Sequence, residues 1–335
     1  MIPQSSSLLT AHNVTIVGDG DQYVVLSHGF GSDQTVWKYL LPYLVSDYRV
    51  LLYDLMGAGS TNPKDFSFSR YSSLHAYADD LLAILDELEI ESCTFVGASV
   101  SGMIGCLASI ERPEVFTKLI LLASSPRYLN DVGYYGGFDQ KDLDQLYGDM
   151  KSNFRSWVTG FGPLAIGADL ESSAVQEFSR TLYSIRPDIA LNVCKTIFQS
   201  DLRSILPLVI TPAFTDISYP ACWLQFDSPC LNKIVTRAQK SIKSSKSDHV
   251  FFHICSARGE TCILNAMMIV TVQVTVPVYV VQTRKDMAVP LQVANYMVRN
   301  LGGWTMMEVL NTGGHLPHLS DPNVVLPVLL RCLAP

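Results

Sequence analysis

One stretch, Cys93–Cys106, constrains the fold of this chain more than any other; it reads C-T-F-V-G-A-S-V-S-G-M-I-G-C. A short run rich in β-formers, Thr94–Val96, leads to Gly97 and then to Ser99. A segment of small and apolar residues that suits a helix follows and ends near Pro113. This layout predicts a nucleophile elbow, a sharp strand-to-helix turn that exposes the hydroxyl of its serine above a sheet.

The elbow departs from the strict pattern G-x-S-x-G, because Ser101 stands where the last glycine is expected and Gly102 comes one residue later. Small residues are needed there because the strand and the helix nearly touch. A bare G-x-S arises by chance about once or twice in a chain of this length. The prediction therefore depends on the strand and helix around Ser99 and on its partner residues.

Strand and helix patterns alternate on both sides of the elbow. Apolar runs predict strands at 14–16, 23–27, 49–54, 94–96, 118–123, 276–282 and 305–310. Apolar residues at helical spacing predict helices at 37–44, 74–88, 291–301 and 322–333. This alternation predicts an α/β fold, with a largely parallel sheet covered on both faces by helices.

The alternation stops between residues 127 and 200. Four short helices are predicted there, near 140–151, 152–160, 172–184 and 187–198, with no strand between them and with many aromatic residues. Ordinary helix packing explains any single aromatic residue among them. Together, an all-helical insertion after a sheet strand predicts a lid over a pocket.

A serine hydroxyl is a weak nucleophile unless a base removes its proton and a carboxylate orients that base. Ser99, Asp286 and His315 follow the order nucleophile, acid, histidine that accompanies such an elbow, and each comes after a predicted strand. Strand ends of a parallel sheet meet at one edge, so we predict that these three residues form a catalytic triad. We expect the backbone N–H groups of Phe30 and Val100 to hold the oxyanion.

Each of these assignments has an alternative. His318 is a second candidate base, and Asp54, which also ends a strand, is a second candidate acid. Because the strand of Asp54 precedes the elbow, we expect Asp54 to anchor a loop. The alternatives for the predicted triad make Asp286 a surface carboxylate and His315 a hydrogen-bonded loop histidine. We expect His28 to orient its glycine-rich loop rather than take part in the chemistry.

Composition limits the classes of partner and cofactor. The net charge of −7 argues against nucleic acid or an anionic membrane surface as the main partner. The eight cysteines show no C-x-x-C pair and no metal-ligand spacing, so we expect reduced thiols, no metal and no cofactor. The N-terminal stretch lacks the basic and apolar segments of a signal peptide, so we expect no secretory leader.

With these residues located, the chain resembles a family of plant hydrolases, the karrikin-insensitive and strigolactone receptors, and lies nearer the karrikin-insensitive branch. The resemblance covers nearly all of residues 8–208 and 274–333. It rests on long strings: L-S-H-G-F-G at 26–31, S-S-P-R-Y at 124–128, Q-E-F-S-R-T-L at 176–182, R-P-D-I-A-L at 186–191, F-Q-S-D at 198–201 and G-H-L-P at 314–317.

The resemblance implies an α/β-hydrolase core at 1–126 and 274–335 with a four-helix lid at 127–208. It implies slow hydrolysis of enol-ether-linked butenolides by a cytoplasmic and nuclear receptor that recruits an F-box subunit of a ubiquitin ligase and a repressor target. By position it implies a pocket lined by Phe30, Tyr128, Leu146, Trp157, Phe161, Phe178, Phe198, Met287 and Ala288. Such an aromatic pocket suits a small uncharged butenolide. The alternative function is that of a small-ester carboxylesterase without a signalling role.

Two positions beside the nucleophile depart from that family. The family usually has histidine where this chain has Ala98, and it tends to have alanine where this chain has Gly102. Both residues adjoin Ser99, so we expect them to affect the rate and the ligand preference rather than the fold.

Residues 209–273 match nothing in that family. Their removal joins Leu208 to Val274 and restores an ordinary entrance to the next strand. The segment starts with Val209, whose codons begin GT, and ends with Gln273, which CAG encodes, as the edges of an intron do. Our hypothesis is a retained intron translated in frame. The alternatives are a genuine insertion loop and a membrane segment at 263–282, which polar residues and Pro277 interrupt.

Overall fold

The computed structural model describes residues 7–210 and 277–334. The predicted insert, 209–273, lies outside these residues apart from Val209 and Ile210. The described strands form a seven-stranded sheet in the order β1-β3-β2-β4-β5-β6-β7. They are β1 (Thr15–Val17), β2 (Gln22–Ser27), β3 (Tyr48–Tyr53), β4 (Cys93–Ala98), β5 (Phe116–Leu122), β6 (Val278–Lys285) and β7 (Thr305–Gly313). Only the β1–β3 pair in this sheet is antiparallel, which confirms the predicted, largely parallel sheet.

Strand β4 lies in the middle of the sheet between β2 and β5. All of its residues are buried, as expected for a continuous apolar run in a parallel strand with both faces covered. Ser99 follows the carboxyl end of β4 and directly precedes helix α3 (Val100–Glu111). The most buried strand thus fixes the position of the predicted nucleophile.

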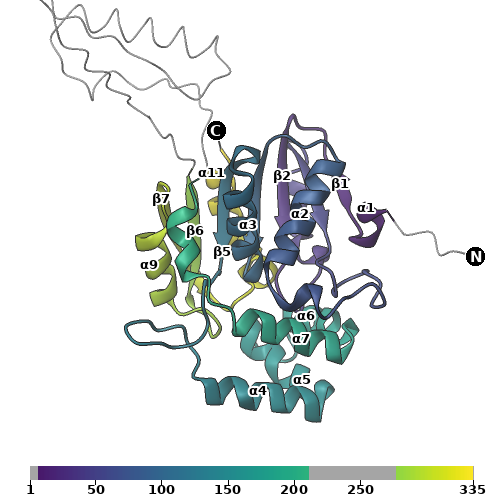
Figure 1. Ribbon diagram of the computed structural model, residues 1–335, viewed down its shortest axis with the longest axis vertical. Coiled ribbons are helices and arrows are strands. Elements are labelled where there is room, and N and C mark those ends of the chain that lie inside the picture. Colours follow the sequence, from purple (N-terminus) through teal and green to yellow (C-terminus); the bar gives the residue numbers. More distant parts are fainter. Residues whose placement is uncertain (1–6, 211–276, 335) are drawn as a thin grey trace, which may run out of the picture. The chain divides into compact units, whose positions relative to one another are not determined.

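Helices cover the two faces of the sheet. On one face, the ring of Phe95 lies so close to α3 that a Cβ on Gly105 would come within 2.4 Å of it. On the other face, Val96 shares a small apolar cavity with Val325 of helix α11 (Pro322–Leu333). Successive strand residues point to opposite faces, so α3 and α11 lie on opposite sides of the sheet. Figure 1 also shows α2 (His75–Glu87) beside α3, and α9 (Leu291–Asn300) beside β6.

One predicted helix is wrong. Residues 37–44 do not form an α-helix; they contribute to two short 3-10 helices, Gln34–Trp37 and Leu41–Tyr43. Pro42 lacks a backbone N–H and restricts the residue before it, so a regular helix cannot run through this segment.

The four predicted lid helices are present. They are α4 (Gln140–Ser152), α5 (Phe154–Ile166), α6 (Ser173–Ser184) and α7 (Pro187–Phe198), and Figure 1 shows them together at one end of the sheet. Polar side chains start three of them: Asp139 in a capping box, Asn153 and Ser172. Helix α5 runs several residues beyond its predicted end and ends at Gly167, whose φ of +74° suits glycine.

Candidate active site

Ser99 has the strained backbone of a nucleophile elbow. Its φ is +56° and its ψ is −124°, a conformation that L-residues rarely adopt. Its N–H donates to the carbonyl of Leu122 at 2.8 Å, which ties the turn to β5. A Cβ on Gly97 would lie 2.6 Å from the Gly102 nitrogen, so the crossing of strand and helix requires glycine at position 97.

The two residues that depart from the strict elbow motif have local explanations. The Ser101 hydroxyl is fully buried and donates to the carbonyl of His28 at 2.5 Å, so it ties α3 to the glycine-rich loop. The hydroxyl of Ser27 donates to Ser101 in turn, at 2.9 Å. A Cβ on Gly102 would lie 2.0 Å from Oγ of Ser124. Serine therefore fits at position 101, while the neighbouring Ser124 requires glycine at position 102.

The structure places Ser99, His315 and Asp286 in one hydrogen-bonded line. Ser99 Oγ lies 2.7 Å from Nε2 of His315, and His315 Nδ1 lies 2.8 Å from Oδ2 of Asp286. Because a carboxylate only accepts, Nδ1 carries the proton and Nε2 is free to accept the Ser99 proton. The Asp286 side chain is fully buried, and its Oδ1 accepts the N–H groups of Ala288 and Val289 at 2.8 and 3.0 Å. This geometry suits a base held in one tautomer beside a nucleophile.

The loop that carries His315 is bound to the lid. The His315 N–H donates to the carbonyl of Ala165, in the last turn of α5, at 2.7 Å. Gly314 has a φ of +84°, and a Cβ there would lie 2.0 Å from the carbonyl oxygen of Ile166. In the sequence, Gly314 serves only to locate His315. Ala165 could not be predicted, because no local pattern marks a carbonyl contact between distant segments.

The glycine-rich loop lies directly against the nucleophile, since a Cβ on Gly29 would come within 2.9 Å of Cβ of Ser99. His28 holds this loop: its Nδ1 donates to the Gly29 carbonyl at 2.8 Å, and its Nε2 accepts the N–H of Leu55 at 2.9 Å. Burial lowers the pKa of His28, so the ring is neutral. Its two hydrogen bonds join the glycine-rich loop to the segment after β3.

The predicted oxyanion donors are the backbone N–H groups of Phe30 and Val100. Within the described residues, neither N–H donates to a protein acceptor. Val100 follows Ser99 in the first turn of α3, and Phe30 follows Gly29, which lies directly against Ser99. Two free donors beside a nucleophile are what a developing oxyanion requires.

The alternative base and acid lie outside this line. The His318 ring is buried and stacks on Trp37 at 4.5 Å, and neither of its nitrogens has a hydrogen-bond partner among the described residues. Burial lowers the pKa of His318 to about 3. The Asp54 carboxylate accepts hydrogen bonds from the Asn13 side chain and from the backbone of Gln34 and Ser60, which fits the expected loop anchor.

Four of the nine predicted pocket residues line a cleft between α4 and α5. The cleft has a volume of about 520 Å³, within the range typical of small-molecule sites. The four are Leu146, Trp157, Phe161 and Met287. Two carboxylates that sequence reasoning did not include, Asp142 and Asp149, also line this cleft.

Four further predicted pocket residues are buried: Tyr128, Phe178, Phe198 and Ala288. Tyr128 packs against Phe198 with ring centroids 4.8 Å apart, and Phe161 lies 6.2 Å from Phe178. Ala288 follows the triad acid and is buried. Burial raises the pKa of Tyr128, and the neighbouring Ser99 hydroxyl opposes that rise. Phe161 thus joins the cleft to the buried Phe178, and Tyr128 and Phe198 form a second buried aromatic pair.

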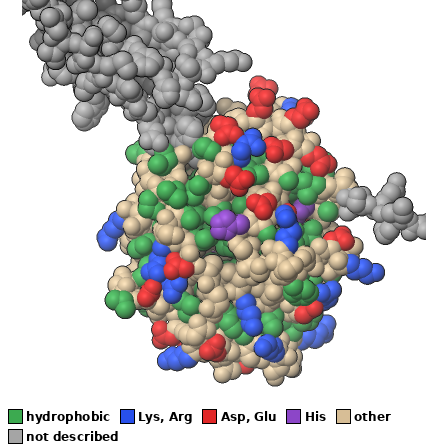
Figure 2. Space-filling view, in the orientation of Figure 1, with side chains coloured by type: hydrophobic (Ala, Val, Ile, Leu, Met, Phe, Trp, Pro, Cys, Tyr) green, Lys and Arg blue, Asp and Glu red, His purple; other side chains and the backbone are tan. Residues whose placement is uncertain are grey.

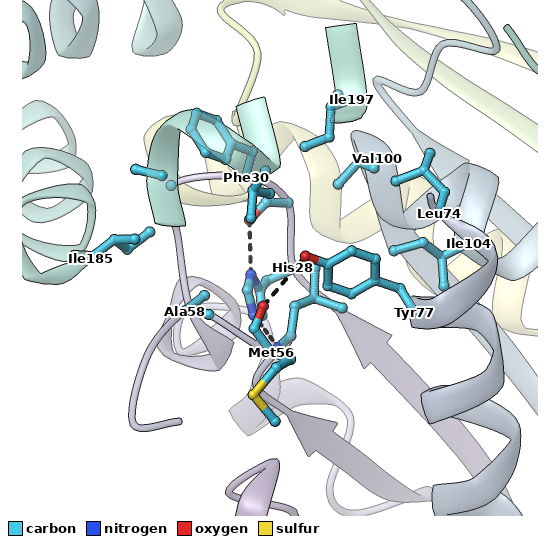
Figure 3. Close-up of a pocket in the computed structure, with 16 residues that line it drawn as sticks. His28, Phe30, Met56, Ala58, Leu74, Tyr77, Val100, Ile104, Ile185 and Ile197 are labelled. Carbon is cyan, nitrogen blue, oxygen red and sulfur yellow. Dashed lines mark hydrogen bonds between the residues drawn. The ribbon is translucent and has the colours of Figure 1, made fainter. Parts of the chain in front are cut away.

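Phe30, the ninth residue, does not line that cleft; it lines a second, narrow cavity behind the glycine-rich loop, which the sequence did not predict (Figure 3). Val100 and apolar side chains from α2, α3 and α7 complete its wall. Its volume of about 20 Å³ holds about one water-sized group. The cleft between α4 and α5 is thus the better size for a ligand.

Neither a metal nor a membrane is indicated by the described part of the chain. No group of three or more metal-ligating side chains occurs there, and no helix there has the length and apolar character needed to cross a bilayer.

The sequence and the fold of this chain are similar to those of known proteins. Residues 22–322 match the family model of the alpha/beta hydrolase fold. The chain is 48% identical to Karrikin insensitive 2 receptor CA of Petunia hybrida, over 96% of this chain and 95% of the relative. It is 43% identical to Strigolactone esterase D14 of Arabidopsis thaliana, over 98% of both chains. A solved hydrolase from Oleispira antarctica matches with a TM-score of 0.74 at 26% identity, over 97% of this chain and 95% of that one. The chain therefore belongs to the alpha/beta hydrolase fold family and, within it, to the family of karrikin-insensitive receptors and strigolactone esterases.

Proposed function

We propose that this protein is a butenolide receptor with slow serine hydrolase activity. The observation that carries the proposal is the line from Ser99 through His315 to Asp286, beside an aromatic lid. The relatives support the choice of ligand, since the chain is 48% identical to one named Karrikin insensitive 2 receptor and 43% identical to one named Strigolactone esterase.

The chemistry follows from this geometry. Ser99 Oγ attacks the ester or lactone carbonyl carbon while its proton passes to Nε2 of His315. Asp286 holds Nδ1–H of His315, and the N–H groups of Phe30 and Val100 stabilise the oxyanion. The carbonyl re-forms as the C–O bond breaks, and His315 returns its proton to the leaving oxygen. Water then attacks the acyl-serine with His315 as base and releases the acid.

We propose that the ligand enters through the cleft between α4 and α5 and that its carbonyl reaches Ser99 among the buried aromatic side chains of the lid. Asp142 and Asp149 line the cleft, so an anionic ligand meets repulsion there while an uncharged lactone does not. On the face drawn in Figure 2, acidic and basic side chains are interspersed. Such a mixed surface favours a small ligand in the cleft over a polyanion on this face.

The signalling part of the proposal extends further. We propose that ligand turnover or binding changes the lid surface and recruits an F-box protein and a repressor target in the cytoplasm and nucleus. The word receptor in the names of several relatives supports this extension.

Hydrolysis of a fluorogenic butenolide tests the enzymatic part, with Ser99→Ala as the blank. We expect slow, saturable hydrolysis that Ser99→Ala abolishes, and a ligand-dependent shift of the melting temperature. Turnover of simple esters at many per second, without ligand-dependent partner binding, would instead favour a carboxylesterase. Activity that survives Ser99→Ala would rule out the mechanism.

A further inference from the structure

A buried glutamine lies beside the triad acid. Gln282 belongs to β6 and is 1% exposed. An amide buried in a sheet is costly unless it is hydrogen-bonded, so its partners show why it is tolerated. Its Nε2 donates to Oδ2 of Asp286 at 3.1 Å and to the carbonyl of Val289 at 2.9 Å.

The orientation of this amide is determined by its partners. A carboxylate oxygen and a carbonyl oxygen both only accept, so the nitrogen has to face them. Oε1 of Gln282 has no partner within the described residues. Both hydrogen bonds of the Gln282 side chain therefore serve the segment from Asp286 to Val289.

The Asp286 carboxylate accepts four hydrogen bonds. Oδ1 takes the two backbone N–H groups of Ala288 and Val289, and Oδ2 takes His315 and Gln282. Among the described residues, Gln282 is thus the one side chain besides His315 that donates to Asp286. It holds the oxygen to which His315 binds.

We infer that Gln282 is a positioning residue of the triad, which fixes the rotation of the Asp286 carboxylate and the loop that carries it. The inference rests on the proposed hydrolase function. Gln282 has no hydrogen bond to Ser99, so it acts through Asp286 and His315. Sequence reasoning missed it because a glutamine within an apolar strand carries no motif.

Replacement by methionine keeps the length of the side chain and removes the donor. We expect Gln282→Met to lower kcat by about 10- to 100-fold, the range for a hydrogen bond to a charged group. KM should stay within about twofold, because binding in the lid cleft is unchanged. Thr94→Val is the matched control, since it removes a buried hydroxyl from the start of β4, where Thr94 pairs with Thr117. We expect it to leave kcat unchanged.

Gln282→Glu tests the positioning role through the pH dependence of kcat, which a purely structural role would not change. At high pH the introduced carboxylate repels Asp286, whereas at lower pH its protonated form donates a hydrogen bond again. The ratio of variant to wild-type kcat should therefore rise by about fivefold or more between pH 8.5 and pH 6. The same ratio for Gln282→Met should stay flat.

Other titratable side chains near Asp286 do not account for the pH dependence of this kcat ratio. Burial raises the pKa of Tyr128 and lowers that of His318 to about 3, so both stay uncharged in this range. Arg284 and Lys285 are exposed. His315 binds the same oxygen of Asp286, and the Gln282→Met ratio, which contains His315 without the introduced carboxylate, serves as its control.

The outcomes separate the two proposals. A wild type without Ser99-dependent hydrolysis overturns both. An active wild type with Gln282→Met within twofold of its kcat, or with a Gln282→Glu ratio that does not change with pH, overturns only the positioning role. Gln282→Glu keeps the size and polarity of the native side chain, so its profile decides the question even if Gln282→Met does not fold.

Discussion

At the scale of single residues, the elbow of this protein depends on how closely β4, α3 and the segment after β5 approach one another. Position 102 is the clearest case, because the family resemblance leads us to expect alanine there and this chain has glycine. A Cβ at Gly102 would meet both Oγ of Ser124, at 2.0 Å, and its Cβ, at 2.7 Å. Ser124 is buried and has little room to move aside. The departure from the family pattern is therefore a packing requirement of this chain.

We expect Gly102→Ala to lower the free energy of unfolding by about 1–3 kcal/mol, the usual cost of overpacking a core. Urea denaturation followed by circular dichroism measures the change. The double variant Gly102→Ala/Ser124→Gly should recover most of the loss, because it removes both clashing atoms. Equal stability of Gly102→Ala and the wild type would show that Ser124 has room to move.

At the scale of elements, the lid and the catalytic loop are coupled through one turn of helix. The carbonyl of Ala165, near the end of α5, accepts the N–H of His315. Carbonyls in the last turn of a helix have no partner within it, so this bond satisfies one of them and places His315 at the same time. Gly167 and Gly314 allow the approach, since a Cβ on Gly167 would lie 3.0 Å from Cα of Gly314.

Gly314→Ala tests this coupling. The new Cβ would lie 2.0 Å from the Ile166 carbonyl oxygen and would strain a backbone φ of +84°. We expect kcat to fall at least about tenfold, because even a shift of about 1 Å in His315 is costly. Gly313→Ala is the control: a Cβ there would meet Lys285 at 3.4 Å, an ordinary contact, so its kcat should stay near that of the wild type. Similar kcat values for the two variants would contradict the coupling.

At the scale of the whole molecule, buried neutral histidines make stability depend on pH. Burial lowers the pKa of His28, and it lowers that of His318 to about 3. The unfolded chain therefore binds these protons first as the pH falls below about 6.5. The free energy of unfolding should fall by about 1.4 kcal/mol per pH unit for each such histidine, down to the pKa in the folded state.

His318→Phe removes one of these contributions and keeps an aromatic ring against Trp37. Between pH 6.5 and pH 5 we expect the wild type to lose about 2 kcal/mol more than the variant. Urea denaturation at the two pH values measures the difference. Identical losses would show that His318 does not stay neutral in the folded protein.

The residues around the predicted insert give a second prediction at this scale. Val209 is fully buried, and the 209–273 deletion would place Val274 in the same position after Leu208. All strands of the described sheet and all three triad residues remain. We expect the deletion variant to fold and to hydrolyse esters with dependence on Ser99. If the deletion variant is insoluble while the full-length protein is active, the segment 209–273 belongs to the fold.

The order of the strands and most helices, the elbow at Ser99 and the positions of Asp286 and His315 after strands could all be predicted from the sequence. These features follow from local backbone preferences and from periodic burial, which short stretches of chain encode. Packing in three dimensions established that Ala165 binds the loop of His315, that Gln282 binds Asp286 and that Ser124 excludes alanine at position 102. It also brought the carboxylates of Asp142 and Asp149 to the lid cleft. Each of these depends on side chains and carbonyls brought within a few ångströms by packing, for which a chain read in order gives no periodic or local signal.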